Sequence, residues 1–170
     1  VMTPKSLLRH KLSVSSLEDL ASGRFEMLID EVESIDANRV KRIVMCSGKV
    51  YYDLRKARAE MNREDVALIR VEQLYPFPDT ECAQTLERYP NATEVVWCQE
   101  EPRNQGAFYQ IRHRIQRAID GRHTLTYAGR MPMAAPAAGY YSRHADEQES
   151  LVSAALGEKP TEYVERRRNP

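Results

Sequence analysis

The sequence predicts an α/β fold, a three-layer sandwich built on a mostly parallel sheet. Short continuous apolar runs, such as residues 43–45 and 95–97, alternate with segments in which apolar residues recur every three or four positions. Strands that are apolar throughout are typical of parallel sheets covered by helices on both faces. Ligands of such sheets bind at the carboxyl ends of the strands, where the strand order reverses. The loops that follow the predicted strands are therefore the candidate functional regions: 47–48, 72–78, 99–106 and 128–141.

The first part of the chain, residues 1–39, predicts a connecting arm with short helices. One short helix is predicted over residues 5–10, because a threonine and a proline at its start are typical of a helix beginning. A second begins at a serine at position 15 or 16 and ends at Gly23. Residues 25–33 mix apolar and acidic side chains and predict no regular element.

From residue 40 onward the pattern becomes regular. Four strands are predicted, over residues 40–46, 66–71, 94–98 and 124–127. Four helices are predicted between and after them, over residues 50–61, 79–89, 107–119 and 144–156. In the third helix, Phe108, Ile111 and Ile115 recur at helical spacing and would share one buried face. Pro90 stops the second helix, because proline lacks the backbone N–H that a helix interior needs.

The composition is that of a soluble globular domain. The 170 residues are 42% apolar and 29% charged, and 25 basic residues balance 25 acidic ones. A net charge of zero gives no support to nucleic-acid binding or to a basic membrane-binding surface. No apolar run approaches the roughly 20 residues of a membrane span. The cysteines Cys46, Cys82 and Cys98 are odd in number and lack metal-site spacing, so they suit a reducing compartment.

We expect the chain to be one domain of a longer polypeptide, because it opens on Val1 without an initiator methionine. Residues 1–157 are predicted to form the domain, with the arm over 1–39 and the core over 40–157. Residues 158–170 are rich in arginine and carry few apolar side chains, so they predict a flexible tail.

Ser47 and Gly48 lie between a predicted strand and a predicted helix. Exposed N–H groups at such a helix start could hold a phosphate or a carboxylate. The surrounding residues match neither G-x-x-x-x-G-K-[ST] nor G-x-G-x-x-G, so neither nucleotide-binding pattern is met. A plain strand-to-helix turn is the alternative, and it is favoured.

Three carboxylates follow predicted strands. Glu72 ends one strand, and Glu100 and Glu101 end another. If the two strands are neighbours, the carboxylates gather at one edge of the sheet, where they would raise one another's pKa and could act as acid and base. The alternative, which we favour, is a structural role in ion pairs with the arginines at positions 70, 103 or 130, or in hydrogen bonds to loop N–H groups.

His144 opens the last predicted helix and is the histidine expected to contact another element. No H-E-x-x-H metal motif and no G-x-S-x-G nucleophile motif is present. No residue is therefore assigned as catalytic, cofactor-binding or metal-binding. The candidate contact or effector residues all lie in or beside the strand-end loops: Ser47, Gly48, Glu72, Gln73, Glu100, Glu101, Asn104, Gln105, Arg130 and His144.

Five segments, in order along the chain, carry a resemblance to a known family. They are MTPKSLLRH (residues 2–10), CSGKVYYDL (46–54), IRVEQLYPFP (69–78), VWCQEEPRNQGAF (96–108) and YAGRMPMAAPAAG (127–139). Together they resemble the C-terminal region of the E1 component of 2-oxoglutarate dehydrogenase, over about residues 1–157. Each segment alone is weak, whereas five in the right order make a specific match.

The resemblance implies a transketolase-like C-terminal domain within a cytoplasmic bacterial enzyme. Such enzymes use thiamine diphosphate and Mg²⁺ to decarboxylate 2-oxoglutarate, and they pass the succinyl group to the lipoyl arm of the E2 dihydrolipoyl succinyltransferase. The resemblance places them in the tricarboxylic acid cycle, and it implies a connection to glycolysis. In that family the cofactor lies between the two preceding domains, across a homodimer interface. The chain is then expected to bind no cofactor and to be inactive alone. Its own contributions would be packing against the dimer partner and the other domains of the same chain, and effector binding.

One position departs from some members of that family. Actinobacterial relatives carry arginines of an acyl-CoA effector site just after the Q-L-x-P-x-P turn, where this chain has Asp79, Thr80 and Glu81. Two acidic side chains would repel a CoA phosphate, so no acyl-CoA site is expected. The alternative to the whole reading is a non-catalytic regulatory module that binds a nucleotide or anion, in a different thiamine-dependent E1 or transketolase-like enzyme.

Overall fold

The structure, a computed structural model, describes residues 3–159 and the backbone of residues 163–165. A single 3₁₀ turn, Lys5–Leu7, precedes the regular elements. The helices are α1 (Leu17–Ser22), α2 (Val50–Glu60), α3 (Asp79–Glu87), α4 (Phe108–Ile119) and α5 (Tyr141–Leu156). The strands are β1 (Leu28–Ile29), β2 (Arg42–Cys46), β3 (Val66–Val71), β4 (Glu94–Pro102), β5 (Thr124–Arg130) and β6 (Tyr163–Glu165). In the part of the chain that is described, no helix is long and apolar enough to cross a membrane.

The strands form one sheet in the order β1-β3-β2-β4-β5-β6. The four central strands run parallel to one another, while β1 lies antiparallel to β3 and β6 lies antiparallel to β5. Both antiparallel edge strands fall where no strand was predicted. β1 lies in the mixed segment 25–33, and β6 lies within the segment 158–170, for which a flexible tail was predicted. Residues 160–162 and 166–170 of that segment lie outside the described residues, and the flexible tail stays a prediction. Strands of two or three residues are too short to show the alternation by which a strand is predicted.

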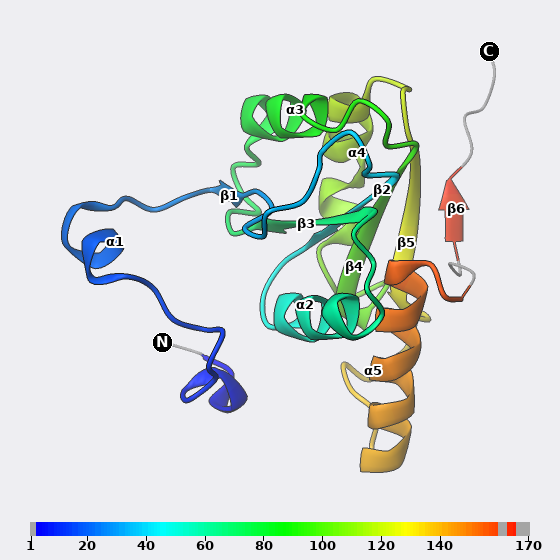
Figure 1. The fold of residues 1–170 in the computed structure, drawn as a ribbon. Coiled ribbons are helices and arrows are strands. Elements are labelled where there is room, and N and C mark those ends of the chain that lie inside the picture. Colours follow the sequence, from blue (N-terminus) through cyan, green and yellow to red (C-terminus); the bar gives the residue numbers. More distant parts are fainter. Residues whose placement is uncertain (1–2, 160–162, 166–170) are drawn as a thin grey trace.

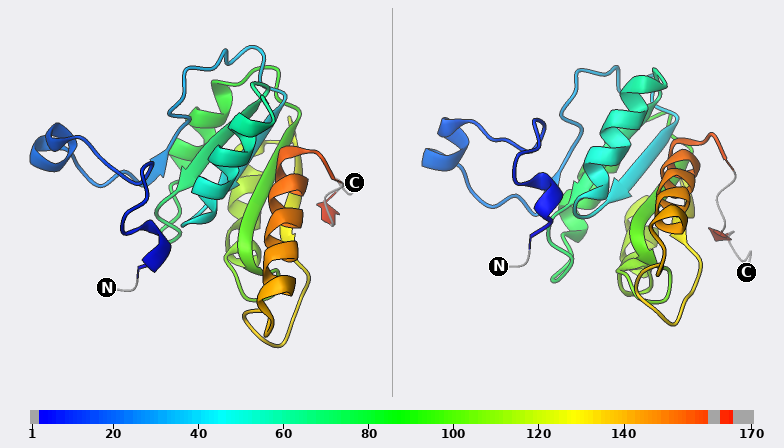
Figure 2. Two further views of the ribbon diagram at one scale, coloured as in Figure 1. Left: turned by 60° about the horizontal axis from the view of Figure 1, so that its bottom comes forward. Right: turned by 90° about the horizontal axis from the view of Figure 1, so that it is seen from below.

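Helices cover both faces of this sheet and make three layers. α3 and α4 lie on one face, and α2 and α5 lie on the other (Figures 1 and 2). The apolar run of β2 supplies both cores, because Ile43 and Met45 point toward the first pair of helices while Val44 and Cys46 point toward the second. All four side chains are fully buried. The predicted three-layer α/β sandwich with a mostly parallel sheet is confirmed.

Besides β5, which continues to Arg130 and so runs three residues past its predicted end, β4 and α5 extend beyond their predicted bounds. β4 continues to Pro102, four residues past the predicted end at Cys98, and its pairing with β5 is irregular between those two residues. The Gln-Glu-Glu sequence therefore lies in a bulged strand end and not in a free loop. α5 begins at Tyr141, three residues before the predicted start at His144. Neither extension could be predicted from the apolar pattern, because the added residues are largely polar. Polar residues interrupt the pattern without ending the strand or the helix.

The arm leaves the sheet domain and returns to it. Near its start, the His10 ring lies 5.2 Å from the Tyr52 ring of α2, measured between ring centroids. The chain then runs outward through α1, which stands apart from the sheet domain in Figures 1 and 2, and comes back at β1. α1 begins with a capping box, because the Ser16 hydroxyl accepts the Asp19 N–H at 3.0 Å and the Asp19 carboxylate accepts the Ser16 N–H at 3.1 Å.

Candidate functional site

A pocket lies at the carboxyl ends of β2, β3 and β4. The chain passes from β2 to β3 on one side and then to β4 on the other side of β2, so the strand order reverses here. This is the place where open α/β sheets bind ligands. The pocket has a volume of about 800 Å³. Its walls are the loops after the three strands and the first turns of α3 and α4, with these residues among them: Ser47, Gly48, Tyr75, Phe77, Asp79, Gln99, Glu101, Gln105 and Arg114.

Gln99 organises the pocket wall made by the end of β4. The side chain is 3% exposed, and its Oε1 accepts the Trp97 indole N–H at 2.8 Å and the Phe108 backbone N–H at 3.1 Å. Its Nε2 donates to the carbonyl oxygens of Glu101 at 3.1 Å and Pro102 at 3.3 Å. A buried amide with both ends satisfied fixes the backbone around it. Gln99 was not among the sequence candidates, because nothing local distinguishes a buried glutamine from a solvated one.

Gly106 closes against this glutamine. A Cβ added at Gly106 would lie 2.1 Å from the Nε2 atom of Gln99, so no larger residue fits while the Gln99 side chain keeps its position. Ser47 and Gly48, which follow β2, also line the pocket. Gly48 has a φ of +78°, a backbone conformation that favours glycine, which accounts for this residue in the favoured reading as a strand-to-helix turn. Anion binding at this turn stays a prediction.

The three predicted carboxylates do not come from neighbouring strands, since β2 lies between β3 and β4. Glu72 lies 3.6 Å from the Arg70 guanidinium, as the structural reading expects. Glu100 forms an ion pair with Lys49 at the start of α2, a partner that was not among the predicted arginines. Glu101 is exposed and lines the pocket. The structure therefore separates the ion-paired carboxylates from the one that faces the pocket.

Asp79 occupies the position where the actinobacterial relatives are expected to carry an arginine. Its carboxylate accepts a hydrogen bond from Arg114 of α4 at 3.0 Å, so the acidic charge is paired within the pocket wall. Thr80 and Glu81 are exposed. The expectation that no acyl-CoA binds here stays a prediction.

Asn104 and Gln105 join two strand-end loops. Both side-chain amides donate to the Met133 carbonyl oxygen, at 3.0 Å and 2.6 Å, and the Asn104 side-chain oxygen accepts the Met133 N–H at 3.0 Å. The loop after β4 is thereby fastened to the loop after β5. Gln73 acts more locally, because its amide donates at 2.8 Å to the Pro76 carbonyl oxygen within the same loop.

Arg130 and His144, which were separate candidates, meet at the end of β5. Arg130 is 6% exposed, and its Nη2 lies 2.7 Å from Nδ1 of His144. Because a guanidinium can only donate, Nδ1 of His144 is the acceptor in this contact. Glu147, one turn further along α5, places a carboxylate oxygen 3.3 Å from Nε of Arg130 and completes the cluster. His144 thus contacts another element, as expected, whereas Glu147 was not among the sequence candidates.

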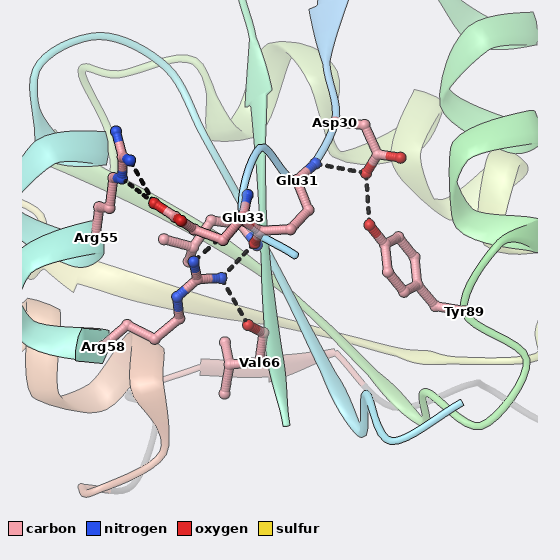
Figure 3. A network of polar contacts seen from close by, with 8 residues as sticks. Asp30, Glu31, Glu33, Arg55, Arg58, Val66 and Tyr89 are labelled. Atoms are coloured by element: carbon pink, nitrogen blue, oxygen red, sulfur yellow. Dashed lines mark hydrogen bonds and ion pairs between the residues drawn. The ribbon is translucent and has the colours of Figure 1, made fainter. Parts of the chain in front are cut away.

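A second polar network, shown in Figure 3, anchors the arm. Glu31 forms an ion pair with Arg58 of α2, and the two side chains are 4% and 7% exposed. The same carboxylate accepts the Leu68 backbone N–H at 2.8 Å, and Arg58 also donates to the Val66 carbonyl oxygen at 3.0 Å. The arm is thereby joined to a helix and to a strand by one buried group.

Two neighbouring acids extend this anchor on either side. Asp30 accepts the Tyr89 hydroxyl at 2.6 Å and forms an ion pair with Arg88 at 2.6 Å. Burial, followed by the hydrogen bond to Asp30, raises the pKa of the Tyr89 hydroxyl, which therefore stays protonated as a donor. Glu33 accepts from Nε of Arg55 at 2.7 Å (Figure 3). Asp30, Glu31 and Glu33 thus attach the arm to both sides of the sheet. Glu31 and Glu33 contact α2, and Asp30 contacts the residues that follow α3.

Metal ligation and thiol chemistry find no site among the described residues. The described residues contain no group of three or more histidines, cysteines, aspartates or glutamates that could hold a metal ion. Burial raises the pKa of the Cys46 and Cys82 thiols to about 12, and it also raises the pKa of the Cys98 thiol. A raised pKa favours the protonated thiol, which is the less nucleophilic form.

The layered sheet and its strand-end pocket define a transketolase-like α/β domain. A solved structure described as a split-gene transketolase, inactive beta4 tetramer, shares this fold with a TM-score of 0.50 and 10% sequence identity, over 69% of this chain and 38% of that one. Residues 14–156 match the family described as 2-oxoglutarate dehydrogenase C-terminal. The chain therefore belongs to this family, which confirms the resemblance.

Relatives support the same assignment at much higher identity. The 2-oxoglutarate dehydrogenase E1 component of Cupriavidus necator is 53% identical over 156 residues, which is 92% of this chain and 16% of that protein. The E1 component of Coxiella burnetii is 53% identical over 158 residues, which is 92% of this chain and 17% of that protein. The chain thus spans about a sixth of these relatives' length. The alternative of a regulatory module from a different enzyme is not favoured.

Proposed function

We propose that this chain is the C-terminal domain of a 2-oxoglutarate dehydrogenase E1 component, an oxidoreductase that decarboxylates 2-oxoglutarate and transfers the succinyl group to a lipoyl E2 enzyme. The observation that carries the proposal is the family match over residues 14–156, together with 53% identity over 92% of the chain. Thiamine diphosphate and Mg²⁺ are bound by the rest of the polypeptide. The protein acts as a cytoplasmic homodimer in the tricarboxylic acid cycle. That cycle oxidises carbon supplied by glycolysis, which connects the enzyme to glycolysis.

The domain contributes assembly and not chemistry to this reaction. Several of its strand-end side chains hold neighbouring segments together, as Gln99, Asn104 and Arg130 do. Such contacts stabilise a surface against which other domains and a second subunit can pack. Glu101 and the pocket beside it are the part of this edge that remains accessible, and they are where an effector would bind.

The experiment that tests the proposal compares the full-length enzyme with the 170-residue chain. The full-length enzyme is expected to release CO₂ from 2-oxoglutarate when thiamine diphosphate and Mg²⁺ are supplied, whereas the chain alone is expected to show no turnover. Calorimetric titration of the chain with thiamine diphosphate, AMP and acetyl-CoA separates the remaining readings. Tight binding of thiamine diphosphate to the chain would contradict the placement of the cofactor. Tight binding of AMP would assign the pocket an effector role.

A substitution at the strand end tests the division between assembly and chemistry. Replacing both Glu100 and Glu101 by Gln in the full-length enzyme removes the Lys49 ion pair and one charge of the pocket. The melting temperature or the dimer fraction is expected to fall more than the rate of decarboxylation. A large loss of rate at an unchanged melting temperature would instead assign these carboxylates to catalysis.

A further inference from the structure

We propose that residues 13–26, which we name the arm loop, pack against the amino-terminal part of the same polypeptide and fix the position of this domain on it. The inference rests on the proposed function, because it requires that the chain be the carboxyl-terminal part of a longer enzyme. It goes beyond that function by naming the segment that makes the contact. The arm loop lies outside the strand-end pocket and outside the sheet core.

Exposure of apolar side chains is the first observation. Val14, Leu17, Leu20 and Phe25 are between 68% and 79% exposed. Removing an apolar side chain from water stabilises a protein, so four exposed ones close together in the chain would gain much from being covered. Single exposed apolar residues are ordinary, whereas a group of them on one segment marks an interaction surface.

The form of α1 is the second observation. A helix of six residues is not stable in water by itself, since nucleation is unfavourable and few hydrogen bonds follow it. This helix nevertheless has a complete capping box, formed by Ser16 and Asp19. Leu17 and Leu20 are three positions apart and share one face of it. Figures 1 and 2 show α1 apart from the sheet domain, so no described residue of that domain covers its apolar face.

The attachment of both ends is the third observation. Before the arm loop, His10 contacts Tyr52 of α2. After it, Glu31 is buried against Arg58 and the Leu68 backbone (Figure 3). A loop held at both ends loses little further entropy when its side chains are covered, which favours binding. Because both ends of the arm loop are attached to the sheet domain, a partner that packs on the loop takes a fixed orientation relative to the sheet.

The chain length of the relatives identifies the partner. The family is described as the C-terminal part of 2-oxoglutarate dehydrogenase, and this chain matches only 16–17% of its relatives' length. The arm lies at the amino-terminal side of the sheet domain, so the remaining polypeptide is joined to it. A tethered partner acts at an effective concentration in the millimolar range. A second copy would need roughly 20–30 residues a side for a stable interface, which is more than the arm loop supplies.

Cysteine labelling of the full-length enzyme tests the proposal. Leu20→Cys places a thiol on the apolar face of α1, and Glu18→Cys is the matched control in the same helix. With an alkylating reagent and peptide mapping by mass spectrometry, the thiol at position 20 is expected to react at least about tenfold more slowly than the thiol at position 18. In the unsubstituted full-length enzyme, the backbone amides of residues 20–22 are expected to exchange with deuterium at least about tenfold more slowly than in an unstructured peptide.

Equal labelling at the two positions, with unprotected amides in the unsubstituted enzyme, would overturn the proposal. Protection that disappears when the enzyme is diluted until its subunits dissociate would overturn it too, because a second copy would then be the partner. Turnover of 2-oxoglutarate is measured in parallel. An active enzyme with a freely labelled position 20 contradicts only the arm contact, and an inactive enzyme with a protected position 20 contradicts only the proposed function.

Discussion

Leu54 and Leu20 are both helical leucines of this chain, and they have opposite surroundings. Leu54 of α2 is 0% exposed between the helix and the sheet, whereas Leu20 of α1 is 77% exposed. The same contrast separates the whole arm loop from the sheet domain. Most apolar side chains of residues 40–156 are buried in the two cores, while the arm loop presents its own to solvent. The sheet domain therefore has a core of its own, whereas the apolar side chains of the arm loop are not covered by the described residues.

Thiol reactivity is expected to show the largest difference. Because burial raises the pKa of Cys46 and Cys82 from 9.0 to about 12, their thiolate fraction is expected to be about a thousandfold lower at pH 8 than that of an ordinary cysteine. Alkylation of the folded chain should be slower than that of the chain in guanidinium chloride by at least this factor. If either cysteine reacted within about tenfold of its rate in the unfolded chain, the sheet domain would not be closed to solvent.

The anchor between arm and domain is expected to give the next effect. Glu31→Gln leaves the buried Arg58 guanidinium without its carboxylate, which is expected to lower the free energy of unfolding by about 3–5 kcal/mol. Glu33→Gln is the matched control, because its ion pair with Arg55 is partly exposed and is expected to cost about 1 kcal/mol or less. Denaturant titration of both variants measures the difference. Equal losses would show that burial does not strengthen the anchor.

The pocket wall is expected to tolerate substitution less well than the loop after β5. Gly106→Ala drives the Gln99 amide out of its place and leaves the Trp97 N–H without an acceptor, which is expected to cost about 2 kcal/mol. Gly139→Ala is the control, because a Cβ at Gly139 meets no atom within 4 Å. Thermal unfolding compares the two variants. A stable Gly106→Ala variant would mean that Gln99 can move without loss.

The arm loop itself is expected to give the smallest effect. Replacing both Leu17 and Leu20 by Ser in the 170-residue chain is expected to change the free energy of unfolding by less than about 0.5 kcal/mol, because neither side chain is buried there. Leu54→Ala is the comparison and is expected to cost about 2–5 kcal/mol. A clear loss in the double variant would show that the arm loop already has a partner within this chain.

Most of the fold could be predicted from the sequence, and the candidate site only in part. The helix–strand alternation was correct because it depends on local periodicity, as in the run Phe108, Ile111 and Ile115. Asn104 and His144, two of the candidate contact residues, lie against other segments, since Asn104 bonds to Met133 and His144 to Arg130. Gln99, the central residue of the pocket wall, was missed because its surroundings come from both ends of one loop.

Partners in ion pairs could not be predicted in the same way. Glu100 pairs with Lys49, which is about fifty positions away, and Glu31 pairs with Arg58 across the boundary between arm and domain. The sequence contains 25 basic residues, and it provides no rule for choosing among them. Burial cannot be read locally either, because Leu17 and Leu54 are the same residue type in helices of the same chain.

By itself, the sequence determined the layered α/β architecture, the positions of most elements and, through five ordered segments, the family. These properties depend on the period of apolar residues and on their order along the chain, which are local. Tertiary structure alone decided that β2 separates β3 from β4, that Arg130 meets His144, and that the arm loop stays uncovered. Each of these depends on which distant segments pack together, because packing free energy belongs to the whole arrangement and not to any one segment.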